Sequence, residues 1–249
     1  MKKYTIAIIG PISLIFVWFI IVKFQFINSF FLPDPLTTIQ KLIQLLTSGI
    51  IIGDLVSTFD RVALAFAIAS VIGLPLGLFL GRSEKLYRSV EFLIDFFRST
   101  PATALFPLFL LIFGITDKSK IAVAAFSSML IIIFNTSYGV MHARKSRILA
   151  AKIMGATKMQ IFRWILFWES LPQTFIGLRS AVSLSLVIIV VSEMFIGTNL
   201  GLGRRILDAQ ITYEIPNMYA VILLTGIIGY LLNFLFIIIE KRFLHWSGK

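Results

Sequence analysis

Long apolar stretches separated by short polar segments dominate the hydrophobic pattern of the chain. A membrane-spanning helix needs about 20 mostly apolar residues, because roughly 30 Å of hydrocarbon is crossed at 1.5 Å per residue. Stretches that approach this length cover residues 6–22, 56–80, 102–115, 121–141, 174–196 and 218–239. The pattern therefore predicts an all-α, polytopic membrane protein with about six transmembrane helices.

Amphipathic segments precede two of these apolar stretches. The third stretch is short and contains Pro107, and an apolar stripe with charges between its members comes before it. The stripe consists of Val90, Leu93, Ile94 and Phe97. Its spacing predicts a helix at the membrane surface that leads into the span. A second amphipathic helix is predicted to begin at Pro35, with Asp34 as its N-cap residue.

The composition supports the membrane interpretation and excludes several classes. Hydrophobic residues make up 58% of the chain and charged residues 14%, and the mean hydropathy is +0.93. A soluble enzyme, a disordered chain and a secreted disulfide scaffold are all excluded by these values and by the absence of cysteine. The net charge of +11 is interpreted as the basic excess of cytoplasmic loops rather than as a nucleic-acid-binding surface.

The distribution of lysine and arginine predicts the orientation. Basic residues favour the segments that are inside when the amino terminus is inside, by about two to one, so both termini are expected to be cytoplasmic. The Met1-Lys2-Lys3 start leads into an apolar run without a small-x-small cleavage site. We therefore expect an uncleaved membrane anchor, with membrane lipid as a partner.

The segment between the fourth and fifth stretches predicts a helical hairpin. Gly155 suits the left-handed position that ends a helix, and Thr157 followed by Gln160 forms a capping box that starts the next one. Ala150, Ala151 and Met154 would share a face of the first helix. Two interpretations stay open at this point, a docking surface for another protein and an amphipathic hairpin that rests on anionic lipid.

The same segment carries a family resemblance. Leu149-Ala150-Ala151-x-x-x-Gly155, followed by Ile165 and Leu171-Pro172, resembles the EAA loop of the membrane subunits of binding-protein-dependent ABC importers. Further matching segments, in the order and at the spacing of that family, extend the resemblance over nearly the whole chain. They are Leu32-Pro33-Asp34-Pro35, the glycines of 73–81, Arg98-Ser-Thr-Pro101, 106–114, Gly177-Leu-Arg179, Glu193 and Gly201-Leu-Gly203. The pattern is similar to the branch that carries nitrate, sulfonate, taurine and related solutes.

The resemblance implies a type I ABC importer-like permease fold in a single transmembrane domain over residues 1–249. It implies a core at about 55–240 and a cytoplasmic coupling loop at about 143–166. The implied coupling residues are Leu149, Ala150, Ala151, Met154, Gly155, Ala156, Thr157 and Gln160. Two positions depart from the family, which has glutamate where this chain has Leu149 and usually proline where it has Trp168. These departures affect how the loop would dock on a partner protein more than they affect the family resemblance.

The resemblance also implies partners: a separate ATP-binding ABC subunit, an extracytoplasmic solute-binding protein and a second permease subunit, expected to be another copy of this chain. The solute would be nitrate, a sulfonate, taurine or similar. A pyrimidine-type vitamin precursor or bicarbonate is the alternative within the same machinery. A stand-alone secondary carrier or channel, or a degenerate non-transporting membrane partner, is the alternative from another class.

Several charged residues lie within or beside the apolar runs. Glu193 lies within a spanning stretch, where a charge costs about 2.5–3.5 kcal/mol at mid-membrane, and it is expected either to line or brace a translocation path or to pack within the bundle. Arg179 is expected to reach the headgroups, and Asp60 and Arg61 to form an interfacial ion pair. Residues 201–205 are expected to form a flexible basic turn or to contact a partner or an anionic solute.

Sequence motifs for chemistry are missing. The chain has no Gly-x-x-x-x-Gly-Lys-Ser/Thr run and no hydrolase motif. His142 and His245 are lone histidines without a second ligand at metal spacing. We therefore expect a transport subunit without a nucleotide, metal or cofactor site of its own.

Overall fold

The computed structural model describes residues 2–244, with side-chain surroundings from residue 9 onward. Its helices run along the chain as follows, with η1 a 3-10 helix and η2 a π-helix. They are α1 (Lys2–Lys23), α2 (Pro35–Thr47), α3 (Ile52–Gly81), α4 (Glu84–Ser99), η1 (Ala102–Leu105), α5 (Phe106–Phe113), α6 (Asp117–Met141), α7 (Lys145–Ile153), α8 (Lys158–Ile161), η2 (Phe162–Leu166), α9 (Phe167–Phe195), α10 (Leu202–Ile211) and α11 (Ile215–Phe243).

Four helical runs in the described residues are long and apolar enough to span a membrane. They are α3, α6, the continuous run Lys158–Phe195 and α11, which match the second, fourth, fifth and sixth predicted spans. The predicted first span lies within α1, whose searched apolar part, Ile9–Lys23, is shorter. The all-α polytopic fold is confirmed.

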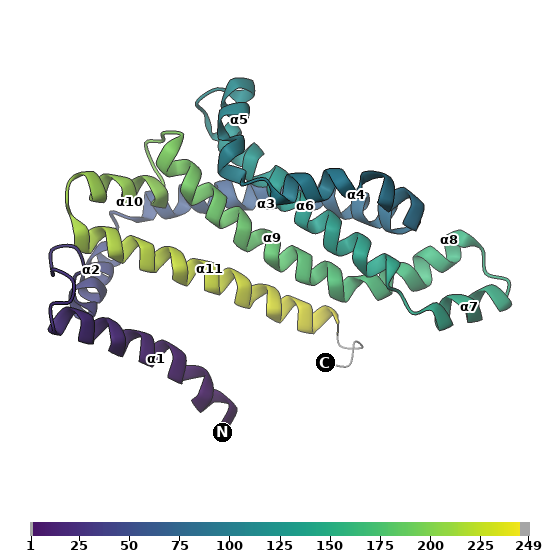
Figure 1. Cartoon of the computed structure of the whole chain (residues 1–249), viewed down its shortest axis with the longest axis horizontal. Coiled ribbons are helices and arrows are strands. Elements are labelled where there is room, and N and C mark those ends of the chain that lie inside the picture. Colours follow the sequence, from purple (N-terminus) through teal and green to yellow (C-terminus); the bar gives the residue numbers. More distant parts are fainter. Residues whose placement is uncertain (1, 245–249) are drawn as a thin grey trace.

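The prediction of a separate span at residues 102–115 is wrong. This segment holds only η1 and the eight-residue α5, which are too short to cross a membrane. The helix breaks because Pro101 forces the preceding Thr100 into an extended conformation, with ψ 125°. α4 and α5 together form a pair bent by 95°, a broken span or a re-entrant element. Both α4 and α5 contact α6, and α5 stands at a steep angle to α4 (Figure 1).

Glycines bring α3, α6 and α9 into close contact and form the centre of the bundle. An added Cβ at Gly77 would lie 2.7 Å from the Cβ of Thr136 on α6, and one at Gly81 would lie 2.6 Å from the Cβ of Val140. On the other side of α6, Gly177 of α9 approaches Asn135 equally closely. Gly73, Gly77 and Gly81 recur at four-residue spacing, which permits such a close helix crossing. The three helices therefore form a tightly packed unit.

Shorter helices occupy the two ends of this unit. α2 and α10 lie at one end, and α7 and α8 lie at the other (Figure 1); we call these the α10 end and the hairpin end. The predicted cap of α2 is confirmed, because Asp34 accepts hydrogen bonds from the amides of Leu36 and Thr37 at 2.7 and 3.3 Å. α1 lies apart from the bundle and packs on α2.

Candidate functional site

The predicted hairpin of α7 and α8 is present at the hairpin end. Gly155 has φ +78°, and two backbone hydrogen bonds close the end of α7 around it. The Gly155 amide donates to the Lys152 carbonyl and the Ala156 amide donates to the Ala151 carbonyl, both at 3.0 Å. This is the Schellman pattern, in which a left-handed residue lets the chain satisfy the last helical carbonyls. The turn is therefore a defined structure rather than slack chain.

The predicted capping box is also confirmed. The Gln160 amide donates to the Thr157 hydroxyl at 3.3 Å, and the Thr157 amide donates to the Gln160 side-chain oxygen at 2.7 Å. Each side chain satisfies a backbone donor that the helix start would otherwise leave open. From this start, α8, η2 and α9 continue as one helical run, Lys158–Phe195. A π-helical segment within such a run is typical of functional positions.

The tip of the hairpin exposes apolar side chains. Met154 is 86% exposed and Ile153 is 79% exposed, and Leu149 and Met159 are also exposed. Ala150 is exposed as well, whereas Ala151 and Ala156 are half-buried. The surrounding residues include Lys145, Arg147, Lys152 and Lys158. Several exposed apolar side chains among basic residues, on one short hairpin, are typical of a contact with another molecule.

Glu193 lies at the opposite end of the same helical run. Its side chain has no solvent exposure. Its carboxylate accepts a hydrogen bond from Arg61 at 2.7 Å, from the Gly203 amide at 2.9 Å and from the Thr58 hydroxyl at 3.0 Å. A buried carboxylate needs such partners, because burial without them is costly. Glu193 of α9 is therefore held by two other helices, α3 and α10.

Arg61 connects these helices to α6. The predicted ion pair between Arg61 and Asp60 is wrong. Adjacent helical residues do not face each other, and Asp60 is exposed. The guanidinium instead donates to Asp117 through Nε at 3.0 Å and Nη2 at 3.3 Å, and to Glu193. Its remaining hydrogen bonds go to the Leu200 carbonyl at 2.8 Å and the Thr198 hydroxyl at 3.1 Å. All five N–H donors of this arginine thus have acceptors.

Residues 201–205 form the start of α10, so the expectation of a flexible basic turn is wrong. Three successive amides at this helix start donate to side chains of the bundle at 2.9 Å. Gly201 donates to Asp54, Leu202 to Thr58 and Gly203 to Glu193. A helix N-terminus attracts anions, and here the chain's own carboxylates occupy it. Arg205 pairs with Asp54 at 2.7 Å, which ties α10 to α3 once more.

We call Thr58, Arg61, Asp117, Glu193 and the first amides of α10 the Glu193 cluster. Lys120, which is buried, pairs with Asp117 at 3.0 Å and completes the charge balance of two cations and two carboxylates. Of the side chains in this cluster, only Glu193 was predicted from the sequence to have a functional role. A signal for the rest was present, because Arg61 and Glu193 are opposite charges within apolar runs, and such charges tend to pair inside a bundle.

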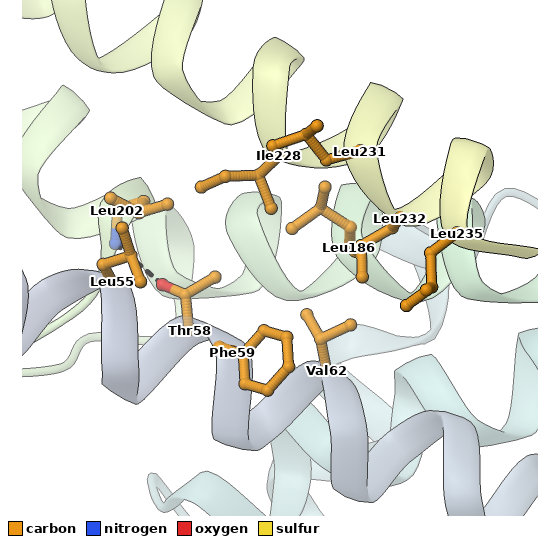
Figure 2. Close-up of a pocket in the computed structure, with 10 residues that line it drawn as sticks. All are labelled: Leu55, Thr58, Phe59, Val62, Leu186, Leu202, Ile228, Leu231, Leu232 and Leu235. Carbon is orange, nitrogen blue, oxygen red and sulfur yellow. Dashed lines mark hydrogen bonds between the residues drawn. The ribbon is translucent and has the colours of Figure 1, made fainter.

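An apolar groove lies beside the Glu193 cluster, between α3 and α11 (Figure 2). Its volume is about 230 Å³, and its lining is aliphatic or aromatic except for Thr58. The Thr58 hydroxyl is engaged by Glu193 and by the Leu202 amide. The groove therefore offers a polar solute no free hydrogen-bonding group among the described lining residues.

Arg179 has different surroundings from those expected. Arg179 pairs with Glu240 of α11 at 3.9 Å, so it links two helices rather than only reaching headgroups. His142 is exposed and stacks on Tyr138, with ring centroids 3.8 Å apart. His245 lies outside the described residues.

Comparison with known proteins places these features in context. Residues 73–245 match the family described as "Binding-protein-dependent transport system inner membrane component". The chain is 26% identical over 253 residues to the taurine transport system permease protein of Escherichia coli (strain K12), covering 100% of this chain and 92% of that protein. It is 29% identical over 223 residues to the formylaminopyrimidine transport permease protein of Halalkalibacterium halodurans, covering 89% and 88%.

A solved structure also matches. A chain from an inward-facing conformation of the MetNI methionine ABC transporter aligns with a TM-score of 0.65 and 25% identity, covering 75% of this chain and 92% of that chain.

Proposed function

The chain belongs to the inner membrane components of binding-protein-dependent transport systems, and from this premise we propose that its α7–α8 hairpin docks a separate ATP-binding subunit. It is a membrane-spanning subunit of an ATP-driven ABC importer. The proposed coupling residues are the eight implied by the sequence resemblance, with Met154 and Gly155 at the tip of the hairpin. They are Leu149, Ala150, Ala151, Met154, Gly155, Ala156, Thr157 and Gln160. Residues 143–166 would form the coupling loop of one transmembrane domain, with its core at about 55–240.

The observation that carries this proposal is the continuous run Lys158–Phe195. It begins at the capping box of the hairpin and reaches the Glu193 cluster, and 38 residues at 1.5 Å each span roughly 57 Å. A continuous helix of this length would transmit a displacement at the exposed hairpin to the far end of the bundle. Closure of the ATP-binding subunits would thus shift the spans between two packings, as alternating access requires.

Glu193 would act on the translocation path by bracing its wall. Its complete burial and its three hydrogen-bonding partners support a bracing role over direct contact with the solute. The hairpin end would face the cytoplasm, together with both termini, because basic residues of the hairpin and of Lys241–Arg242 gather there. A second copy of the chain would complete the path, and an extracytoplasmic solute-binding protein would deliver the solute.

The proposed solute is a small molecule of the nitrate, sulfonate or taurine type. The full-length similarity to a taurine permease supports this class. A pyrimidine-type vitamin precursor is the second candidate, because the permease for formylaminopyrimidine is similar at 29% identity; bicarbonate completes the alternatives. Stimulation of ATP hydrolysis by the solute-binding protein loaded with taurine or with formylaminopyrimidine would separate the first two.

Copurification tests the docking proposal. The tagged chain would be isolated in mild detergent and its eluate assayed for ATP hydrolysis. We expect a stoichiometric ATP-binding subunit that is lost in an Ala150→Glu, Gly155→Val double variant. Gly226→Ala is the matched control, since an added Cβ there meets no described atom within 4 Å. A partnerless chain that still moves solute in liposomes would make it a stand-alone carrier or channel.

A further inference from the structure

Glu169, at the start of α9, contacts the first turn of α7. One carboxylate oxygen accepts a hydrogen bond from the Arg144 amide at 2.6 Å, and the other accepts one from the Arg147 guanidinium at 2.7 Å. The Glu169 side chain is 12% exposed, whereas that of Arg147 is 58% exposed. The contact joins residues separated by more than 20 positions, so it fixes α7 to a different helix.

The geometry is that of a capping box completed from another helix. Arg144 is the N-cap residue of α7, and Arg147 stands three positions later, where a capping box has glutamate or glutamine. Arginine only donates hydrogen bonds, so α7 cannot form the box from its own residues. Glu169 supplies the missing carboxylate to the N-cap amide, and Arg147 holds that carboxylate through an ion pair. The negative charge also lies at a helix N-terminus, where it is favourable.

This contact closes the base of the hairpin. α8 is already continuous with α9 through η2, so its end of the hairpin follows α9. The α7 end is joined to α6 through residues 142–144, a short link outside both helices. Nearby, Gly139 of α6 packs directly on Ser170 of α9, where an added Cβ would lie 2.8 Å from the Ser170 carbonyl oxygen. Glu169 extends this contact to α7.

We propose that Glu169 is a positioning residue for coupling, because it makes α7, α8 and α9 move as one body. This inference rests on the proposed docking of an ATP-binding subunit to the hairpin. Without Glu169, α7 would pivot about residues 142–144, and force applied at the tip would bend the hairpin instead of moving α9. The contact with Glu169 matters more because Leu149 is exposed and uncharged, so this side chain gives α7 no charged contact of its own.

Two readouts that need no transported solute test the role. The chain contains no cysteine, so Ser89→Cys on α4 and Lys152→Cys on α7, both exposed and outside the proposed coupling residues, can carry a pair of spin labels in the membrane-embedded complex. Glu169→Ala is expected to broaden the distribution of distances between the labels. A second readout is the ATPase rate of the complex divided by that of the isolated ATP-binding subunit. Glu169→Ala should bring this ratio about fivefold closer to one. Arg147→Ala should give a smaller change, because Glu169 still accepts from the Arg144 amide.

Glu84→Ala is the matched control, since it removes an exposed carboxylate that pairs with Arg88. If Glu169→Ala fails to accumulate, Glu169→Gln and Arg147→Ala carry the test. If these variants keep the wild-type distance distribution and the wild-type ATPase ratio, the inference is overturned, even if their thermal stability is lower. A wild-type chain that binds no ATP-binding subunit would instead overturn the docking proposal, so the two failures are distinguishable.

Discussion

The α10 end and the hairpin end of the bundle hold their functional residues in opposite ways. At the α10 end, Glu193 and Arg61 are buried and fully partnered within a charge-balanced cluster. At the hairpin end, Met154 and its apolar neighbours are exposed on a hairpin shaped mainly by local backbone hydrogen bonds. One helical run connects the two.

This contrast indicates a division of labour along α9. Buried ion pairs that lose a partner are strongly destabilising, so the Glu193 cluster fixes how α3, α6, α9 and α10 meet. Exposed caps and turns contribute about 1 kcal/mol each, so the hairpin can change without unfolding the bundle. Substitutions at the α10 end should therefore lower stability, and substitutions at the hairpin should lower coupling.

The largest effect is expected at Gly203. A Cβ there would lie 2.0 Å from the Val190 carbonyl oxygen, a backbone atom that cannot move cheaply. Gly203→Ala should therefore destabilise the protein by more than about 3 kcal/mol, at or beyond the usual range for overpacking. The yield of monodisperse protein after heating in detergent measures this. Gly226→Ala should keep the wild-type yield, and equal yields from both variants would show that α10 is not packed as described.

Removal of Glu193 should have the next largest effect. Glu193→Ala leaves Arg61 with only Asp117 as an acidic partner and opens the Gly203 amide. A loss of about 3 kcal/mol is expected, at the lower end of values for a broken buried pair. Heating curves in detergent provide the measurement. Glu84→Ala, in an exposed pair, should change the curve by less than about 0.5 kcal/mol; a comparable loss in both would contradict the role of burial.

A substitution at Gly155 should separate coupling from folding. Its φ of +78° disfavours a β-branched residue, although an added Cβ meets no described atom within 4 Å. Gly155→Val should reshape the turn, abolish solute uptake driven by ATP and leave abundance normal. Gly155→Asn should keep most activity, because asparagine tolerates the left-handed conformation. Normal uptake by the valine variant at normal abundance would contradict the lever role of the hairpin.

The smallest effect is expected at the capping box. Thr157→Ala removes the hydroxyl that accepts from the Gln160 amide and should cost about 1 kcal/mol locally. Amide hydrogen exchange in residues 158–161 should accelerate about fivefold, which corresponds to that free energy. Exchange at the buried start of α10 should stay unchanged. Acceleration at both ends would mean that the two regions are not independent in stability.

Local signals in the sequence predicted much of the fold and of the hairpin. Gly155, the Thr157–Gln160 box and the Asp34 cap depend on residues close in the chain, so their geometry follows from short patterns. The four-residue spacing of glycines in α3 is a similar local signal for close helix contact. The bend at Thr100 was missed, although Pro101 carried the signal.

The Glu193 cluster and Glu169 were harder to predict because their partners are distant in sequence. Arg61 and Glu193 are 132 positions apart, and only the packed bundle brings them together. The nearest charge, Asp60, therefore suggested a local ion pair that helix geometry does not permit. Glu169 caps α7, which precedes it in the chain by the length of the hairpin. No sequence pattern marks a contact of this kind.

The most direct test of the account is a cross-link from the tip of the hairpin. A photoreactive maleimide would be attached to Met154→Cys in the otherwise cysteine-free chain, within the complete complex. Ile211→Cys is the control, because this side chain is exposed at the α10 end. The account predicts an adduct with the ATP-binding subunit from position 154 and none from position 211. Absence of the adduct at 154, or equal adducts at both positions, would contradict it.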